Sequence, residues 1–347
     1  MASKREQAAQ NQHYVPKFIL RNFLSDEKNE RVAVFSKKTG KGFVTSIRNI
    51  MAERRFHEFA IGEDYLASFE ESMCRIEDVL LPTYRKVIEE RRLDLSPEER
   101  GNLATFMAFQ FIRTRAQREQ FVRVEEQLKE QMEKWGGSIE QLEGYEPLTD
   151  DLLAYNHIEF MRTAIGEFAL HIASKDMLLL SAPEGRSFYL ADNPVCLHNS
   201  EPTDPFFSNL GLAVQAIEIY LPLTADLMLA AWCPSLLERM RAEREREHTD
   251  RKRELLAGVD RGHMTAEQMR QQLALLNERL EPVDQLLANF EAGTPVPMQE
   301  TSMDQSNSLQ MNFAGEFIIC KRGDFALAKQ FVKDAPSHTD KASSASV

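Results

Sequence analysis

The sequence lacks the marks of several large protein classes. Its four cysteines are far apart and form no Cys-x-x-Cys pair, which argues against a zinc ribbon, a redox motif or a disulfide framework. No apolar run approaches the roughly eighteen residues of a membrane helix, and the polar start lacks the apolar segment of a secretory signal. We therefore expect a cytoplasmic protein that makes no membrane contact.

Positive charge is in short supply as well. The 42 lysines and arginines face 54 aspartates and glutamates, so the formal net charge of the 347 residues is −12. This charge opposes non-specific attraction to nucleic acid but leaves room for a local basic pocket. The sequence also has no Walker, nucleophile-elbow or dinucleotide-binding fingerprint.

The pattern of apolar and polar residues predicts an α+β fold, with long helices packed on one face of a mainly antiparallel sheet. The clearest helix start is Ser96-Pro97-Glu98-Glu99, which combines a cap, a first-turn proline and a capping-box glutamate. A short helix is predicted to begin at residue 16, and three further predicted helices cover residues 63–91, 96–135 and 149–174. Predicted strands cover residues 31–36 and 42–46, which form a hairpin that joins the sheet, and residues 177–181, 187–190, 216–221, 227–232 and 316–321.

Three segments lie outside this pattern. Residues 1–12 are predicted to be a flexible arm and residues 335–347 a disordered tail, which leaves residues 13–334 as a single α+β domain. Residues 235–292 are rich in Arg, Glu and Leu, so we interpret them as a helical insertion that projects from the sheet. The insertion is either an exposed helical hairpin or the contact for a protein partner or a homodimer.

His13-Tyr14-Val15-Pro16 is the most unusual string near the start. The proline holds the residue before it extended, so His13 takes a defined direction relative to the helix that carries Arg21. Such an imidazole can act as a general base or a metal ligand, or it can make a structural hydrogen bond. We treat His13 as a candidate catalytic residue, and Tyr14 and Arg21 as candidate substrate-binding residues.

Two predicted helices carry further candidates. Glu70 and Glu77 lie two turns apart on one helix face, about 10 Å along the axis, which is too far for these two alone to hold one ion. They either flank a basic pocket or lie in solvent. Gln110 and Arg113 are polar positions in an apolar helix, where a buried arginine needs an anionic partner. That partner is either a substrate anion or one of the two glutamates.

Polar residues near the later strands complete the candidate set. Asp192-Asn193-Pro194 follows an apolar strand, a place where binding groups are common, although the same string also opens turns. Asn307 can donate to a substrate or cap a helix. A divalent metal is a candidate cofactor, but the spacing of these residues assigns no ligand to it.

These pieces resemble one family in their order along the chain. His13-Tyr14-Val15-Pro16, the helix at residues 106–114, Asp192-Asn193-Pro194 and residues 220–224 resemble the family of domain of unknown function 4238. The resemblance spans about residues 11 to 330, and the charged insertion departs from it. It implies that five residues converge: His13, Arg113, Asp192, Asn193 and Asn307.

A site that combines a histidine, an arginine, carboxylates and an amide is typical of hydrolysis at a phosphoester bond. The imidazole moves protons, the guanidinium stabilises negative charge, and the carboxylates orient water or a metal ion. The leading hypothesis is a nuclease-like phosphoester hydrolase that binds a phosphate-containing ligand or nucleic acid. Two other classes stay open: a non-catalytic module that binds an anionic ligand or a protein, and a structural interaction protein whose polar core sets the fold.

Overall fold

The computed structural model describes residues 11–61, 65–201 and 210–334, and it confirms the α+β class with antiparallel sheets. The larger sheet has the order β12-β7-β11-β10-β9, and only the β12–β7 pairing is parallel. Its strands are Val296–Pro297, Asp176–Ser181, Leu227–Trp232, Ile217–Thr224 and Cys196–Asn199.

The second sheet has the order β3-β2-β13-β8, and all its pairings are antiparallel. Its strands are Lys41–Ser46, Arg31–Ser36, Phe317–Cys320 and Tyr189–Ala191. The predicted hairpin of β2 and β3 is present. It forms this sheet with two strands from the second half of the chain instead of extending the larger sheet.

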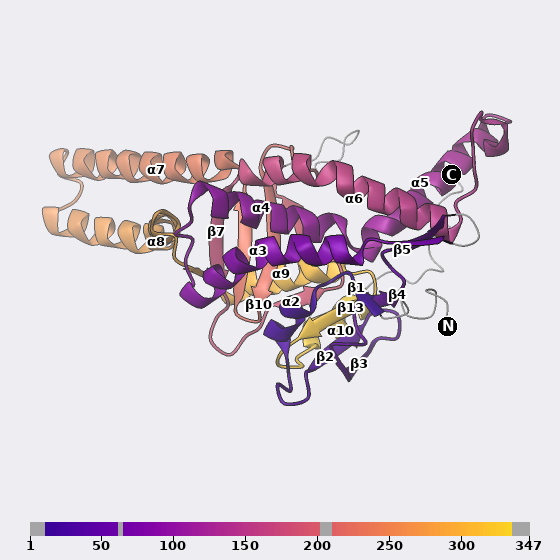
Figure 1. Ribbon diagram of the computed structural model, residues 1–347. Coiled ribbons are helices and arrows are strands. Elements are labelled where there is room, and N and C mark those ends of the chain that lie inside the picture. The colour runs from indigo at the N-terminus through magenta and orange to yellow at the C-terminus, as the bar shows by residue number, and fades with distance from the viewer. Residues whose placement is uncertain (1–10, 62–64, 202–209, 335–347) are drawn as a thin grey trace.

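Helices cover both faces of the larger sheet (Figure 1). On one face, α3 (Glu70–Glu90) and α4 (Pro97–Ile112) share a core with Leu179, Ile219 and Leu229, and α6 (Asp150–Ala173) packs against α4. On the opposite face, α9 (Glu300–Phe313) packs Met303 against Leu178 and Met228. The helix α9 was not predicted, because its Asp, Ser and Asn residues have low helix propensity.

Two predicted helix boundaries are wrong. Tyr65–Ser68 is strand β6, which pairs with β5 (Glu58–Ile61), so the helix predicted from residue 63 begins as α3 at Glu70. The helix predicted for residues 96–135 is interrupted at Arg113 and Thr114, which separate α4 from α5 (Arg115–Lys134). Thr114 donates its hydroxyl to Asn193 Oδ1 at 3.1 Å instead of capping α5, and this contact from another element fixes the break.

Two residues of the predicted arm belong to a strand. Asn11 and Gln12, predicted to lie in the arm, belong to strand β1 (Asn11–His13), which pairs with β4 (Ala52–Arg54). The short helix α2 (Lys17–Leu20) and a 3-10 turn at Arg21–Phe23 follow. Residues 1–10 and the predicted tail 335–347 lie outside the described residues.

The charged insertion is a helical hairpin. Helices α7 (Pro234–Asp260) and α8 (Ala266–Ala292) run side by side and extend beyond the rest of the molecule (Figure 1). The last helix, α10 (Ala326–Asp334), packs on α9. Within the described ranges, no helix has the length and apolar character needed to cross a membrane.

Candidate functional site

His13 is held at three points. The pairing of β1 with β4 places its backbone beside Ala52, and its carbonyl oxygen accepts a hydrogen bond from Arg113 Nη2 at 2.9 Å. Its ring Nε2 lies 2.8 Å from the carbonyl oxygen of Ile47. A carbonyl can only accept, so Nε2 carries the proton and Nδ1 keeps its lone pair. The side chain is therefore a fixed imidazole in one tautomer.

Arg113 holds the backbone of His13. Its side chain is only 3% exposed, and Nη1 donates to Glu77 Oε1 at 2.5 Å. The guanidinium also stacks on the Phe109 ring. Of the two partners expected for this arginine, the structure shows the glutamate: Arg113 and Glu77 form a largely buried ion pair that fixes the His13 backbone.

Tyr14 and Gln110 belong to the same support. Gln110 is fully buried and donates from Nε2 to the Tyr14 carbonyl oxygen at 3.1 Å. The Tyr14 ring packs against Phe56, and burial raises the pKa of its hydroxyl. Both residues are buried behind the histidine, so the structure places them where they position His13.

His13 lines a cavity of about 540 Å³, which we call the His13 cleft. One wall is a single face of α3, because Glu70, Cys74, Glu77 and Arg85 recur at helical spacing along it. Five predicted site residues meet in this cleft: His13, Arg21, Glu70, Glu77 and Arg113.

The cleft combines a neutral base with one carboxylate whose pKa is lowered. Burial lowers the pKa of His13, and the nearby Lys17 and Arg113 lower it further, while the Ile47 carbonyl and Glu70 oppose the shift. Burial raises the pKa of Glu70, but the hydrogen bond from His57 and the charge of Arg113 outweigh it and leave that pKa below its usual value. At neutral pH, His13 is therefore uncharged and Glu70 is a carboxylate.

The mouth of the cleft carries three exposed cations. Lys17, Arg21 and Arg85 line it, and Arg21 also donates from Nε to Glu30 at 2.9 Å. Lys17 and Arg85 were not identified from the sequence, although Lys17 follows His13 by four residues and Arg85 continues the Glu70–Glu77 face. Burial and the neighbouring carboxylates raise the pKa of the Cys74 thiol, so it is not an activated nucleophile.

Asp192 and Asn193 lie elsewhere. The Asp192 carboxylate accepts hydrogen bonds from three successive backbone N–H groups, those of Gly315, Glu316 and Phe317, at 2.7, 2.8 and 2.9 Å. Burial raises its pKa, while these bonds and Lys37 oppose the rise. Asp192 lines a separate cavity of about 430 Å³ with Lys37 and Arg115, and Asn193 is buried against Thr114.

Asn307 also lies apart from the His13 cleft. Its Oδ1 accepts from Tyr189 N at 2.8 Å, and its Nδ2 donates to Ser187 O at 3.2 Å. It lines a cavity of about 380 Å³ on the far side of β8. Of the five residues implied by the resemblance, His13 and Arg113 are in contact, while Asp192, Asn193 and Asn307 lie around β8 and α9.

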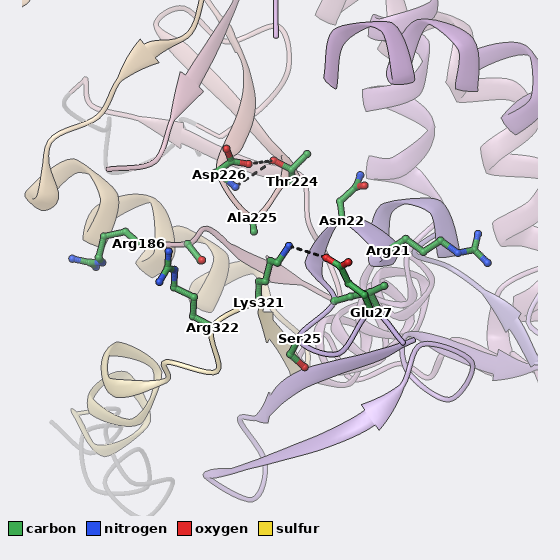
Figure 2. Close-up of a pocket in the computed structure, with 12 residues that line it drawn as sticks. Arg21, Asn22, Ser25, Glu27, Arg186, Thr224, Ala225, Asp226, Lys321 and Arg322 are labelled. Atoms are coloured by element: carbon green, nitrogen blue, oxygen red, sulfur yellow. Dashed lines mark hydrogen bonds and ion pairs between the residues drawn. The ribbon is translucent and has the colours of Figure 1, made fainter. Parts of the chain in front are cut away.

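A further cavity of about 750 Å³, shown in Figure 2, lies beside the His13 cleft and shares Arg21 with it. We call it the Arg322 cavity. Its other cations are Arg186, Lys321 and Arg322, and its carboxylates are Glu27 and Asp226. Figure 2 shows Lys321 facing Glu27, with 3.7 Å between Nζ and Oε1.

Across the residues that the structure describes, no group of three or more His, Cys, Asp or Glu side chains is arranged to hold a metal ion. His57 and Arg113 already bind Glu70 and Glu77, the two α3 glutamates that line the His13 cleft.

The chain matches the model of one family, described as a protein of unknown function (DUF4238), over residues 11–324. No curated protein and no solved structure matches it.

Proposed function

The chain belongs to the DUF4238 family, whose description assigns no activity, and we propose from the His13 cleft that the protein hydrolyses phosphoester bonds with His13 as the general base. The carrying observation is a buried, neutral imidazole fixed by the Ile47 carbonyl in a cleft whose mouth is cationic. A base with a pKa at or below the working pH is ready to take a proton.

The cationic mouth supports a phosphate as the bound group. Lys17, Arg21 and Arg85 present exposed positive charge toward the cavity. Arg21 uses Nε for its hydrogen bond to Glu30, so its Nη1 and Nη2 groups remain to bind a phosphate. Planar guanidinium groups and lysine ammonium groups are the usual partners of phosphate oxygens. These three side chains would hold the ester and stabilise the charge that develops on its oxygens.

The reaction follows from the placement of these groups. Water bound beside Glu70 gives a proton to His13 Nδ1, and its oxygen attacks phosphorus. The bond from phosphorus to the leaving oxygen breaks, and that oxygen takes a proton from solvent at the open mouth. Arg113 acts as a positioning residue because it holds the His13 backbone, and Glu77 acts through its ion pair with Arg113.

The test uses bis(p-nitrophenyl) phosphate as a small phosphodiester. His13→Gln retains an amide N–H for the Ile47 carbonyl but has no group that can take a proton at neutral pH, so kcat/KM should fall by about 100-fold or more. In the parent protein, kcat/KM should rise with pH through a pKa below 6.5 and then stay level, because the depressed pKa keeps His13 neutral above it.

The matched control is His171→Gln, which changes a half-exposed histidine on α6. It should leave kcat/KM at the parent value, and the melting temperatures of both variants should stay close to the parent's. Unchanged turnover in His13→Gln would refute His13 as the base. A melting shift with inorganic phosphate, lost in Arg85→Ala but accompanied by no turnover, would replace the hydrolase with an anion-binding module.

A further inference from the structure

Three cavities follow one another on the surface because neighbouring cavities share lining residues. The His13 cleft and the Arg322 cavity share Arg21. The Arg322 cavity and the cavity beside Asn307 share Arg186, Ser187 and Arg322. The His13 cleft and the Arg322 cavity therefore adjoin each other at Arg21.

The sign of the charge along this path is opposite to that of the whole protein. The chain carries a formal net charge of −12, whereas four cations and two carboxylates line the Arg322 cavity. A positive lining in a negative protein concentrates polyanions at this groove and repels them elsewhere. The charge pattern therefore fits a ligand with more than one phosphate.

The availability of the cations differs along the groove. Arg186 is held by ion pairs with Glu300 and Asp304, and Lys321 lies 3.7 Å from Glu27. Arg322 is exposed and forms no ion pair with any part of the chain that the structure describes. Arg322 can therefore bind a phosphate without first breaking an ion pair, so we expect the largest effect from this residue.

We propose that the substrate is a single-stranded polynucleotide that lies from the His13 cleft past Arg21 into the Arg322 cavity, where Arg322 binds a phosphate remote from the scissile bond. This inference rests on the proposed hydrolase function and names its substrate class. His13 is only 8% exposed at the base of its cleft. A flexible strand can bring a phosphate to that depth, while a duplex holds its phosphates on the outside of a stiff cylinder.

The first measurement is the fluorescence anisotropy of labelled oligothymidylate, about 15 nucleotides long, against parent protein, Arg322→Ala and Arg270→Ala. Arg270 is an exposed arginine on α8 that pairs with Glu267, and it serves as the matched control. Arg322→Ala should weaken binding about tenfold and lower the slope of log K against log salt by about 0.7. Arg270→Ala should change neither value.

Length dependence gives a second readout. We expect a trinucleotide to occupy the His13 cleft alone, so parent and Arg322→Ala should bind it equally. Parent affinity and slope in Arg322→Ala, or a trinucleotide that binds as tightly as the long strand, would overturn the proposal. Equal competition by a duplex of the same length would overturn the single-stranded assignment.

Failure of this inference is separable from failure of the hydrolase. Turnover of bis(p-nitrophenyl) phosphate without any Arg322 effect on the long strand overturns the groove and leaves the hydrolase intact. Binding of the long strand that depends on Arg322, without turnover of either substrate, supports the groove and overturns the hydrolase.

Discussion

Burial keeps two histidines near the site in their neutral forms. His157 donates from Nε2 to the Ile112 carbonyl at 2.8 Å and accepts at Nδ1 from Arg118 at 3.2 Å, so a second ring proton would meet a donor. His57 is fully buried, and its Nδ1 bonds Glu70 at 2.9 Å. Burial lowers the pKa of His157 to about 3 and that of His57 to about 4.

These pKa values make the folded state sensitive to mild acid. The unfolded chain protonates each histidine near pH 6.5, whereas the folded chain resists protonation until about pH 4 for His57. The free energy of unfolding should therefore be highest above pH 6.5 and fall as the pH drops. Each such histidine contributes about 1.4 kcal/mol per pH unit.

The change that tests this is His57→Gln, whose amide can still donate to Glu70. Urea unfolding between pH 6.5 and pH 5 should show a pH slope that is smaller by about 1.4 kcal/mol per unit than in the parent. His171→Gln, at a half-exposed site, should keep the parent slope. An equal slope in His57→Gln and the parent would show that His57 titrates alike in the folded and unfolded chains.

The sequence identified several residues of the His13 cleft but missed other groups that hold the candidate residues in place. His13, Glu70, Glu77 and Arg113 were predicted because their residue types and helical spacing stand out, and they meet in one cleft. His57 had no local signal, because its partner Glu70 is thirteen residues away and on another element. The Asp192 carboxylate accepts hydrogen bonds from the backbone N–H groups of residues 315–317. These residues are too far from Asp192 in the sequence for spacing to predict the contact.

At the scale of elements, α9 replaces a missing strand beside β8. One edge of β8 pairs with β13, and the N–H groups of Tyr189 and Ala191 on the other edge donate to the side chains of Asn307 and Gln310. Asn307 and Gln310 are three residues apart and so share one helix face. Their amides satisfy buried strand groups that would otherwise lack a partner.

Asn307→Leu should therefore destabilise the protein by about 2–4 kcal/mol, because it leaves the Tyr189 N–H and the Ser187 carbonyl without their partner in a buried site. Urea unfolding measures this loss. Gln305→Ala, at an exposed position of the same helix, should change stability by about 0.5 kcal/mol or less. If Asn307→Leu kept its stability but no longer bound the oligothymidylate, Asn307 would instead be a ligand contact.

The elements that were predicted correctly are stabilised by contacts between residues close together in the sequence. The capping box of Ser96 and Glu99 is present, and the hairpin of β2 and β3 follows its own turn. The helix α9 escaped prediction because its stability comes from β8 and from buried Met303 and Met311, not from its own residues. The break between α4 and α5 likewise depends on Asn193, seventy-nine residues away.

At the scale of the molecule, the α7–α8 hairpin is held together largely by its own contacts. Leu255, Leu276 and Leu280 are buried, and Arg244 donates from two nitrogens to the Asp284 carboxylate at 2.7 and 2.8 Å. Only its base packs on the sheet, through Leu286 and Phe290. That the hairpin contacts a partner or a second copy of the chain stays a prediction.

Removal of the outer hairpin should leave the core folded. Arg244 and Asp284 face each other across the two helices, so a short Gly-Ser linker can join them in place of residues 245–283, because packed helix axes lie about 8–10 Å apart. The melting temperature should change by about 4 °C or less, since the deleted part contributes little to the main core.

Leu237→Ala, at a fully buried position in the base, should lower the free energy of unfolding by about 3 kcal/mol. If the deletion abolished cooperative unfolding while Leu237→Ala did not, the hairpin would be part of the folding core and not an appended arm.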